Sequence, residues 1–271
     1  MTRAPATAKL NLALVVGRVR DDGKHEVTTV LQRLDLADRV AVKVAPQLSV
    51  DGFDDTIVRT ALEALAGAAG VAPAWRVRLS KRIPAAAGLG GGSSDAATAL
   101  RLANATLGEP LPAAGLAEVA AGVGADVPFF LTQGPQLGEG DGSELTPLAL
   151  PQDYWVVLVL PHGATKSSTQ SVYAAFDERD GAKGYRTRRA ALRRALEGVA
   201  RPRDLAALPR NDLASSPLAE ELLGLGAFRA DVTGAGPVVY GLFQHREEAR
   251  AARRAAGRFG RTWLTVPAWY G

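Results

Sequence analysis

The sequence contains no cysteine, which excludes disulfides, thiolate metal sites and cysteine nucleophiles together. It also lacks an apolar N-terminal segment of the signal-peptide kind and any run of about 18 apolar residues, so neither export nor membrane insertion is indicated. We therefore expect a cytoplasmic protein. Aromatic residues are scarce, at 6% of the chain, and they do not interleave with the arginine-rich stretches as base-stacking residues of an RNA-binding protein would.

The arginines give the chain a formal net charge of +4 and a pI near 9.6. They concentrate in two helix-like stretches, where the spacings Arg189 to Arg193 and Arg250 to Arg254 place them on solvated helix faces. A positive field of this size could attract nucleic acid or raise the local concentration of small polyanionic substrates. We favour solvated faces over nucleic-acid binding.

Hydrophobic residues make up 47% and charged residues 22% of the 271 residues, proportions that are ordinary for one large or two medium globular domains. Read coarsely, the chain divides near Pro147–Pro151, and we predict two domains, 1–150 and 151–271. Hydrophobic periodicity predicts strands and helices in both. The strands are expected at 10–19, 40–44, 75–79, 154–160, 229–233, 238–243 and 262–266, and the helices near 60–69, 94–107, 113–123, 168–177, 188–197 and up to 256.

Residues 83–100 read IPAAAGLGGGSSDAATAL, a glycine-rich loop that runs into a helical pattern. Glycine lets the backbone approach a ligand closely, and the free N–H groups of a helix's first turn attract an anion. Ser93 and Ser94 can bind a phosphate oxygen or hold Mg²⁺, and Asp95 is expected at the helix start. The sequence therefore predicts a cradle for a polyphosphate, although a turn that only caps a helix is the simpler alternative.

Two common phosphate motifs do not fit this loop. The P-loop requires a lysine after its glycines, and the dinucleotide fingerprint requires a third glycine where this chain has Ser93. The loop instead resembles the ATP-binding motif of the GHMP kinases, P-x-x-x-G-L-G-S/G-S-S/G-A/S. The segments ATAKLNLALVVGRVRDDGKHEVTTVLQRLDLADRV, GADVPFF, ND and TGAGPVVYGLF extend the resemblance over nearly the whole chain.

The resemblance implies an α+β fold of two domains, an N-terminal domain like ribosomal S5 domain 2 and a C-terminal ferredoxin-like domain. The order strand, helix, strand, strand, helix, strand after Pro151 independently suggests a ferredoxin-like sheet. The resemblance also implies that ATP and Mg²⁺ take part, with Ser94 as a candidate metal ligand. The candidate ATP-binding residues are Pro84, Ala85, Ala86, Ala87, Gly88, Leu89, Gly90, Gly91, Gly92, Ser93 and Ser94.

Two charged residues stand in apolar segments, where a charge must be paired, hydrogen-bonded or functional. Asp126 lies in GADVPFF and could cap the turn before Pro128, but the resemblance implies a catalytic base that also touches the substrate. Lys9 lies in AKLNL, and the resemblance makes it the second catalytic residue, with a snorkelling surface lysine as the alternative. If this segment is a strand, the side chain of Asn11 points to the same face as that of Lys9 and could bind the substrate with it.

Within the family, these segments resemble the branch that phosphorylates the tertiary 2-hydroxyl of a cytidine-diphosphate-linked polyol in non-mevalonate isoprenoid synthesis. That branch carries an aromatic residue where this chain has Lys24, in DGKH, and often a phenylalanine at the position of Leu31. His25 is retained, and Tyr173 aligns with a second aromatic residue of the pocket, so we assign Lys24, His25 and Tyr173 to substrate binding. The Lys24 ammonium could instead reach the diphosphate of the substrate.

We thus expect an ATP-dependent small-molecule kinase, a monomer or weak homodimer, without nucleic-acid or membrane partners. The missing aromatic residue keeps a second interpretation open, a GHMP kinase that acts on homoserine or a mevalonate-like alcohol. An RNA-binding or regulatory protein on a related fold is the more distant alternative. Asp141, in GEGDG, and residues 233–236 are interpreted as loop and turn residues, and the resemblance places the second of these near the phosphate loop.

Overall fold

The structure is a computed structural model that describes residues 1–53, 56–164 and 168–268. The chain forms two compact units that alternate along the sequence. Unit 1 contains Met1–Ala8, Leu36–Ala85 and Gly90–Gln133, and unit 2 contains Lys9–Asp35, Ala86–Leu89 and Gly134–Gly271. This division differs from a single boundary at Pro147–Pro151, because the long paired strands β1 (Thr2–Val19) and β2 (His25–Val44) contribute to both units.

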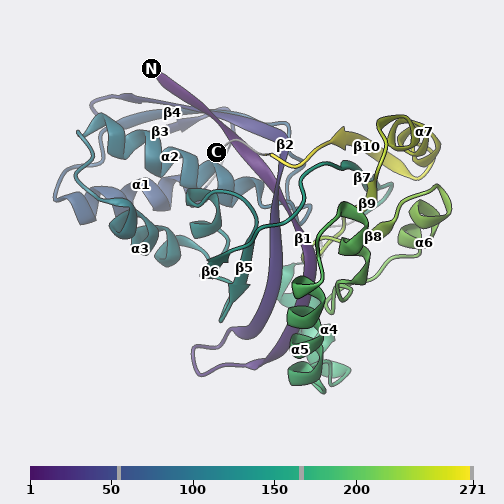
Figure 1. The fold of residues 1–271 in the computed structure, drawn as a ribbon. Helices are drawn as coiled ribbons and strands as arrows, with labels where there is room; N and C mark the ends of the chain where they lie inside the picture. The colour runs from purple at the N-terminus through teal and green to yellow at the C-terminus, as the bar shows by residue number, and fades with distance from the viewer. Residues whose placement is uncertain (54–55, 165–167, 269–271) are drawn as a thin grey trace. The chain divides into compact units, whose positions relative to one another are not determined.

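Unit 1 combines strands and helices (Figure 1). Strand β4 (Trp75–Ser80) pairs in parallel with β3 (Ser49–Asp51) and antiparallel with the end of β2. The alternation in β4 of buried Trp75, Val77 and Leu79 with exposed residues gives it one core-facing side. Helix α1 (Thr56–Ala69) packs against α2 (Gly91–Thr106) and α3 (Ala113–Val123), and the short helix η1 (Pro128–Leu131) follows α3.

Unit 2 contains a four-stranded antiparallel sheet in the order β10-β7-β9-β8. The strands are β7 (Trp155–Pro161), β8 (Arg229–Val232), β9 (Val239–Phe243) and β10 (Gly260–Thr265). With helices α6 (Pro217–Gly224) and α7 (Arg246–Ala256) they form the β–α–β–β–α–β sequence of elements that was expected for this half of the chain. The mixed α+β content predicted from the sequence is thus confirmed.

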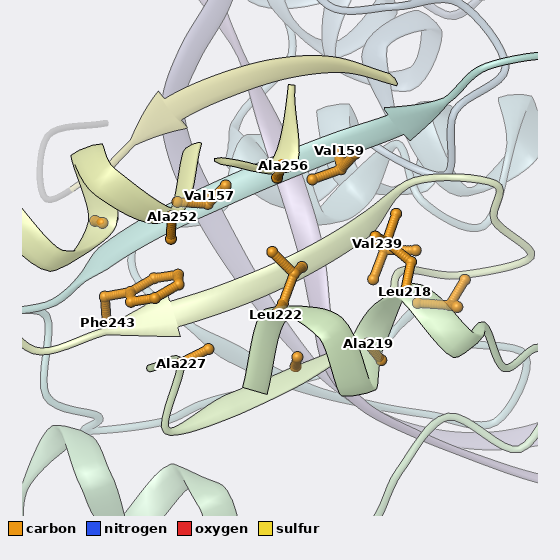
Figure 2. Packing of buried hydrophobic residues seen from close by; sticks show 13 residues of the cluster. Val157, Val159, Leu218, Ala219, Leu222, Ala227, Val239, Phe243, Ala252 and Ala256 are labelled. Atoms are coloured by element: carbon orange, nitrogen blue, oxygen red, sulfur yellow. The ribbon is translucent and has the colours of Figure 1, made fainter. Parts of the chain in front are cut away.

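Figure 2 shows the core of this sheet, where α6 and α7 bury their apolar residues against the strands. Leu222 of α6 and Ala252 of α7 lie over Val157 and Val239 of the two central strands. The helix that covers the sheet beside α7 is therefore α6, which was not predicted. The two predicted helices of this region, α4 (Thr169–Glu178) and α5 (Tyr185–Glu197), both form.

Helices α4 and α5 pack on opposite faces of the β1–β2 hairpin within unit 2. Phe176 of α4 is buried with Leu14, Val16 and Val27, whereas the Tyr185 hydroxyl of α5 lies 3.0 Å from Thr28 Oγ1. Val27 and Thr28 are consecutive residues of a strand, so their side chains point to opposite faces. The remaining elements of unit 2 are β5 (Gln136–Glu139), β6 (Glu144–Pro147) and the short helix η2 (Pro202–Ala207).

Candidate functional site

The glycine-rich loop leads into α2, and three of its residues adopt the left-handed backbone conformation. Their φ angles are 55° at Ala86, 79° at Gly88 and 68° at Gly90, and Gly90 is the N-cap residue of α2. The helix begins at Gly91, three residues before the predicted Ser94, so Asp95 is its fifth residue and does not lie at its start as expected. The first free N–H groups of α2 thus belong to the glycines, which leave room for an anion.

Loop residues Gly88 and Leu89 are held within unit 2. The Lys9 N–H donates to the Leu89 carbonyl at 2.9 Å, and the Thr233 hydroxyl donates to the Gly88 carbonyl at 3.3 Å. A Cβ atom on Gly88 would lie 2.2 Å from the Thr233 carbonyl oxygen, a backbone atom that cannot move aside. The requirement for glycine here is therefore steric as well as conformational, and the turn at residues 233–236 does pack against the loop.

Lys9 and Asn11 share one face of β1, as their spacing predicted. Lys9 Nζ donates to Asn11 Oδ1 at 2.6 Å, and Asn11 Nδ2 donates to the Thr29 hydroxyl at 2.8 Å. Only 4% of Lys9 and 5% of Asn11 is exposed, which excludes the snorkelling alternative for this lysine. A buried ammonium that is oriented by an amide beside a phosphate-type loop is suited to stabilise negative charge on a reacting group.

The ND pair, Asn211 and Asp212, braces this arrangement. Asn211 Nδ2 donates to the carbonyls of Val232 at 3.0 Å and Gly234 at 2.6 Å, which fixes the turn that carries Thr233. Asp212 Oδ2 accepts from the Val16 N–H at 2.8 Å and from Arg188 Nε at 2.9 Å. The pair thus positions main-chain groups of unit 2 and the side chain of Arg188.

Lys81 joins two buried carboxylates within unit 1, a cluster that the sequence did not predict. Its Nζ lies 2.6 Å from Asp38 Oδ2 and 2.5 Å from Asp95 Oδ2, and both aspartates are fully buried. Asp38 also accepts from the N–H groups of Arg82 and, at 2.8 Å, Ile83, at the entry to the loop. Burial alone would lower the pKa of the Lys81 ammonium, but Asp95 and Asp38 outweigh it and raise this pKa above its ordinary value.

The only sequence signal for this cluster was a lysine two residues before Ile83 and an aspartate inside an apolar helix face. Asp38 lies far from both in the sequence, so the contact depends on the fold. The cluster ties the loop entry to α2, and we assign Lys81 as a positioning residue for the loop.

The two serines of the loop differ in exposure. Ser93 is half-buried, whereas 1% of Ser94 is exposed. In the part of the chain that the structure describes, no group of three His, Cys, Asp or Glu residues could hold a metal ion. This donor set suits a Mg²⁺ ion that binds mainly through substrate phosphates with one or two protein ligands.

Asp126 lies in the turn between α3 and η1, in unit 1, and is half-buried. The N-cap residue of η1 is Val127, so Asp126 lies one residue before the N-cap position. Val127, Phe129 and Pro128 beside it are buried. The turn thus presents a partly accessible carboxylate from an apolar support, as a general base requires.

His25 and Tyr173 form one aromatic cluster in unit 2. Their ring centroids lie 4.5 Å apart at an interplanar angle of 32°, and the Phe176 ring meets His25 edge-on at 6.1 Å. His25 Nε2 lies 2.9 Å from Asp177 Oδ1. Because a carboxylate accepts, Nε2–H donates, and Nδ1 of the neutral ring is then an acceptor.

Lys24 lies in the turn directly before His25, and Leu31 lies further along β2. The Lys24 ammonium pairs with Asp141 Oδ2 at 2.5 Å, in the turn between β5 and β6 where a loop was predicted for Asp141, so it is engaged by a carboxylate. Leu31 is buried in β2. Burial alone would raise the pKa of Asp141, but hydrogen bonds from Lys24 and from Ser143 Oγ, at 2.6 Å, lower it to about 2.

This depressed pKa predicts a pH effect on stability. The stabilisation by Asp141 is fully present above its ordinary pKa of 3.8 and is lost as the pH falls through about 2. Because Lys24 is half-exposed, we expect roughly 1 kcal/mol. Asp141→Asn should therefore lose less unfolding free energy than the parent between about pH 5 and pH 2 in urea titrations. Asp21→Asn, an exposed carboxylate of the same hairpin, should lose as much as the parent; equal losses in all three proteins would contradict the assignment.

Comparison with known proteins agrees with these features. Residues 55–134 match the GHMP kinases N terminal domain and residues 187–262 match the GHMP kinases C terminal model. Among helices in the described ranges, none combines the length and the apolar character that crossing a bilayer requires.

A 4-diphosphocytidyl-2-C-methyl-D-erythritol kinase of Geobacter sulfurreducens is 36% identical over 279 residues, with 96% of each chain covered. A crystal structure of 4-(cytidine 5'-diphospho)-2C-methyl-D-erythritol kinase superposes with a TM-score of 0.79 at 30% identity, covering 98% of this chain and 99% of that one. A crystal structure of a mevalonate kinase shares the fold at 12% identity, with a TM-score of 0.75 and coverage of 98% and 99%. The chain therefore belongs to the GHMP kinases, in the family of the 4-diphosphocytidyl-2-C-methyl-D-erythritol kinases.

Proposed function

We propose that this chain transfers a phosphoryl group from ATP to the 2-hydroxyl of 4-diphosphocytidyl-2-C-methyl-D-erythritol in the non-mevalonate isoprenoid pathway. The observation that carries the kinase assignment is the buried Lys9–Asn11 pair, whose main chain holds the glycine-rich loop at Leu89. The relatives at 30% identity or more carry the same substrate in their names, whereas the mevalonate kinase shares only the fold. The cytidyl substrate is thus favoured over homoserine or a mevalonate-like alcohol.

The loop and the first turn of α2 bind the triphosphate in this mechanism. The backbone N–H groups after Gly90 and the Ser93 hydroxyl donate to phosphate oxygens, with the N-terminal dipole of α2 adding to the attraction. The cluster of Lys81, Asp38 and Asp95 holds the loop entry and the helix in register. A Mg²⁺ ion, with Ser94 as its proposed protein ligand, would neutralise charge on the phosphates.

Asp126 takes the proton of the acceptor hydroxyl as the oxygen–phosphorus bond forms and the bond to the leaving ADP oxygen breaks. The Lys9 ammonium, oriented by Asn11, neutralises charge that develops on the transferred group and helps to position the hydroxyl.

The substrate's cytosine is placed by the aromatic cluster of unit 2. Tyr173 provides a ring face for stacking, and Nδ1 of His25 can accept from the exocyclic amino group, which is a donor. Asp177 fixes the His25 tautomer that makes Nδ1 an acceptor. Lys24 would line this end with its stem.

The proposal is tested by incubating the purified chain with ATP and a panel of alcohols that includes the cytidyl compound, homoserine and mevalonate. We expect phosphorylation of the cytidyl compound with the highest kcat/KM. If homoserine or mevalonate is the preferred substrate, the chain has another GHMP kinase activity. If the chain binds RNA and phosphorylates none of the alcohols, the proposed kinase function is wrong.

Replacing Tyr173 by Ala should raise KM for the cytidyl substrate about tenfold or more, because base–aromatic stacking contributes roughly 1–3 kcal/mol. KM for ATP should change little. Lys24→Tyr should lower the KM for the cytidyl substrate by adding a stacking face, and steady-state kinetics on both variants checks this. If both leave that KM unaltered, the cytosine does not lie at this cluster.

Replacing Lys9 by Met should lower kcat by roughly 10²–10³, the usual effect of removing one donor that stabilises transition-state charge. Met keeps the length of the side chain but cannot donate to Asn11. Lys43→Met, an exposed lysine of β2, is the matched control and should keep the parent's kcat. Turnover of Lys9→Met within a factor of two of the parent would remove Lys9 from the mechanism.

A further inference from the structure

A cavity of about 780 Å³ lies in unit 2 between the β1–β2 hairpin and the start of α5. Basic side chains predominate in its lining, which includes Arg18, Arg20, Lys183, Arg186 and Arg189. Glu26 and Asp180 are the acidic residues that line it. The cavity is therefore a concave region of positive charge.

Two of these cations already have carboxylate partners. Arg20 lies 3.6 Å from Asp22 and 3.9 Å from Glu26, and Arg189 lies 2.6 Å from Glu139. Across the described ranges of the chain, Arg18, Lys183 and Arg186 form no salt bridge. Glu26 and Asp180 offset part of the positive charge, but the five basic side chains outnumber them, so an anion placed among the cations would relieve their remaining repulsion.

The wall of this cavity is fixed by packing and hydrogen bonds. Tyr185 lies against Gly17, where a Cβ atom would come within 3.1 Å of the ring. Arg188 Nη2 donates to the Gly181 carbonyl at 2.8 Å and so holds the turn that carries Lys183. Gly184, with φ 76°, is the N-cap residue of α5, a helix of 13 residues. The first turn of this helix adds N–H groups and positive potential beside Arg186.

The cavity is separate from the aromatic cluster. His25 and Glu26 are consecutive residues of β2, so their side chains point to opposite faces of the hairpin. His25 contacts Tyr173 and Asp177 of α4, whereas Glu26 lines the cavity with residues of α5. An occupant of the cavity would leave the cytosine cluster accessible.

We propose that this cavity binds a small molecule that bears a diphosphate or longer phosphate chain, at a second site that the phosphoryl transfer does not use. A volume of about 780 Å³ lies in the range of small-molecule pockets. A diphosphate is negatively charged near neutral pH and so complements the net positive charge of this lining, and guanidinium groups bind phosphate oxygens in a bidentate manner.

Calorimetric titration of the complete chain with inorganic pyrophosphate tests this proposal. A saturating non-hydrolysable ATP analogue is present throughout, so that the glycine-rich loop is filled. We expect one saturable site in the parent. The double variant Lys183→Gln/Arg186→Gln should raise the Kd for pyrophosphate at least about tenfold, because it removes two charge-assisted contacts.

The matched control is Arg250→Gln/Arg254→Gln, which removes the same charge from the exposed face of α7. Its Kd should stay within a factor of two of the parent's. The proposal is overturned if the parent shows no saturable site, if the cavity variant binds as the parent does, or if both double variants weaken binding equally. A single-stranded RNA that binds more tightly than pyrophosphate and is lost in the cavity variant would replace the small molecule by a nucleic acid.

Turnover separates this proposal from the proposed function. Without pyrophosphate, the cavity variant should keep the parent's kcat on the cytidyl substrate, since neither changed residue belongs to the catalytic or substrate-binding set. A failed alcohol panel would thus leave the binding experiment interpretable, and a failed titration would leave the kinase assignment intact.

Discussion

Asp126→Asn should lower kcat by roughly 10²–10⁴, the range for removal of a positioned general base, while the affinity for ATP changes little. The amide keeps the size of the carboxylate but cannot take the proton of the acceptor hydroxyl. The turn that carries Asp126 is supported by buried Val127 and Phe129, so the exchange should not disturb the fold. Single-turnover kinetics with saturating ATP and substrate measures the effect on the chemical step.

Glu118→Gln is the matched control, because Glu118 is an exposed carboxylate on α3, the helix that leads into this turn. This variant should retain the parent's kcat. Thermal unfolding of both variants should give Tm values close to the parent's. Loss of activity in Glu118→Gln, or turnover of Asp126→Asn within a factor of two of the parent, would assign the base to another residue.

Lys81→Met should lower the unfolding free energy by about 3–5 kcal/mol, because it leaves two buried carboxylates without their cation. Asp38 and Asp95 are fully buried, and both lie within 2.6 Å of the Lys81 ammonium. The loop entry and α2 would no longer be tied together, so the Kd for ATP should also rise about tenfold. Urea unfolding and calorimetric titration with an ATP analogue measure the two effects.

Lys81→Arg keeps the positive charge at this position but changes the shape of the side chain. A guanidinium can serve both carboxylates, so this variant should recover part of the unfolding free energy that Lys81→Met loses. The control Lys43→Met, at an exposed lysine, should lower the unfolding free energy by less than about 0.5 kcal/mol. If Lys81→Met and Lys43→Met had the same unfolding free energy, the cluster of Lys81, Asp38 and Asp95 would not stabilise unit 1.

The sequence predicted elements best where one face is clearly apolar. Strand β4 alternates with period two, and α3 begins and ends at the predicted residues Ala113 and Val123. Helix α6 was missed because its apolar stretch is short, although its start signals are present, with Ser216 as the N-cap residue and Pro217 in the first turn. The start of α2 was placed too late because glycine has a low helix propensity, yet Gly91 lies within its first turn.

For the candidate site, residues close in sequence could be predicted and residues brought together by the fold could not. The Lys9–Asn11 contact follows from the period of a strand. The aromatic cluster of His25 and Tyr173 required the resemblance to the family, because a lone histidine carries no such information. Two ion pairs could not be predicted in the same way. The Lys81–Asp38 pair depends on strand register in unit 1, and the Lys24–Asp141 pair depends on strand register in unit 2. The local sequence pattern does not specify either register.

The order of synthesis has a consequence for strands β1 and β2. Leu12 of β1 offers its carbonyl to Arg229 Nη2 at 2.6 Å and to the Tyr240 hydroxyl at 3.2 Å, and the Val16 N–H donates to Asp212. These partners lie at residues 212–240, so the Leu12 carbonyl and the Val16 N–H remain without them until most of the chain has been synthesised, although β1 and β2 pair with each other early. A nascent chain that ends at Pro147–Pro151 would therefore expose apolar hairpin surface, and we expect it to be a chaperone substrate rather than a folded domain.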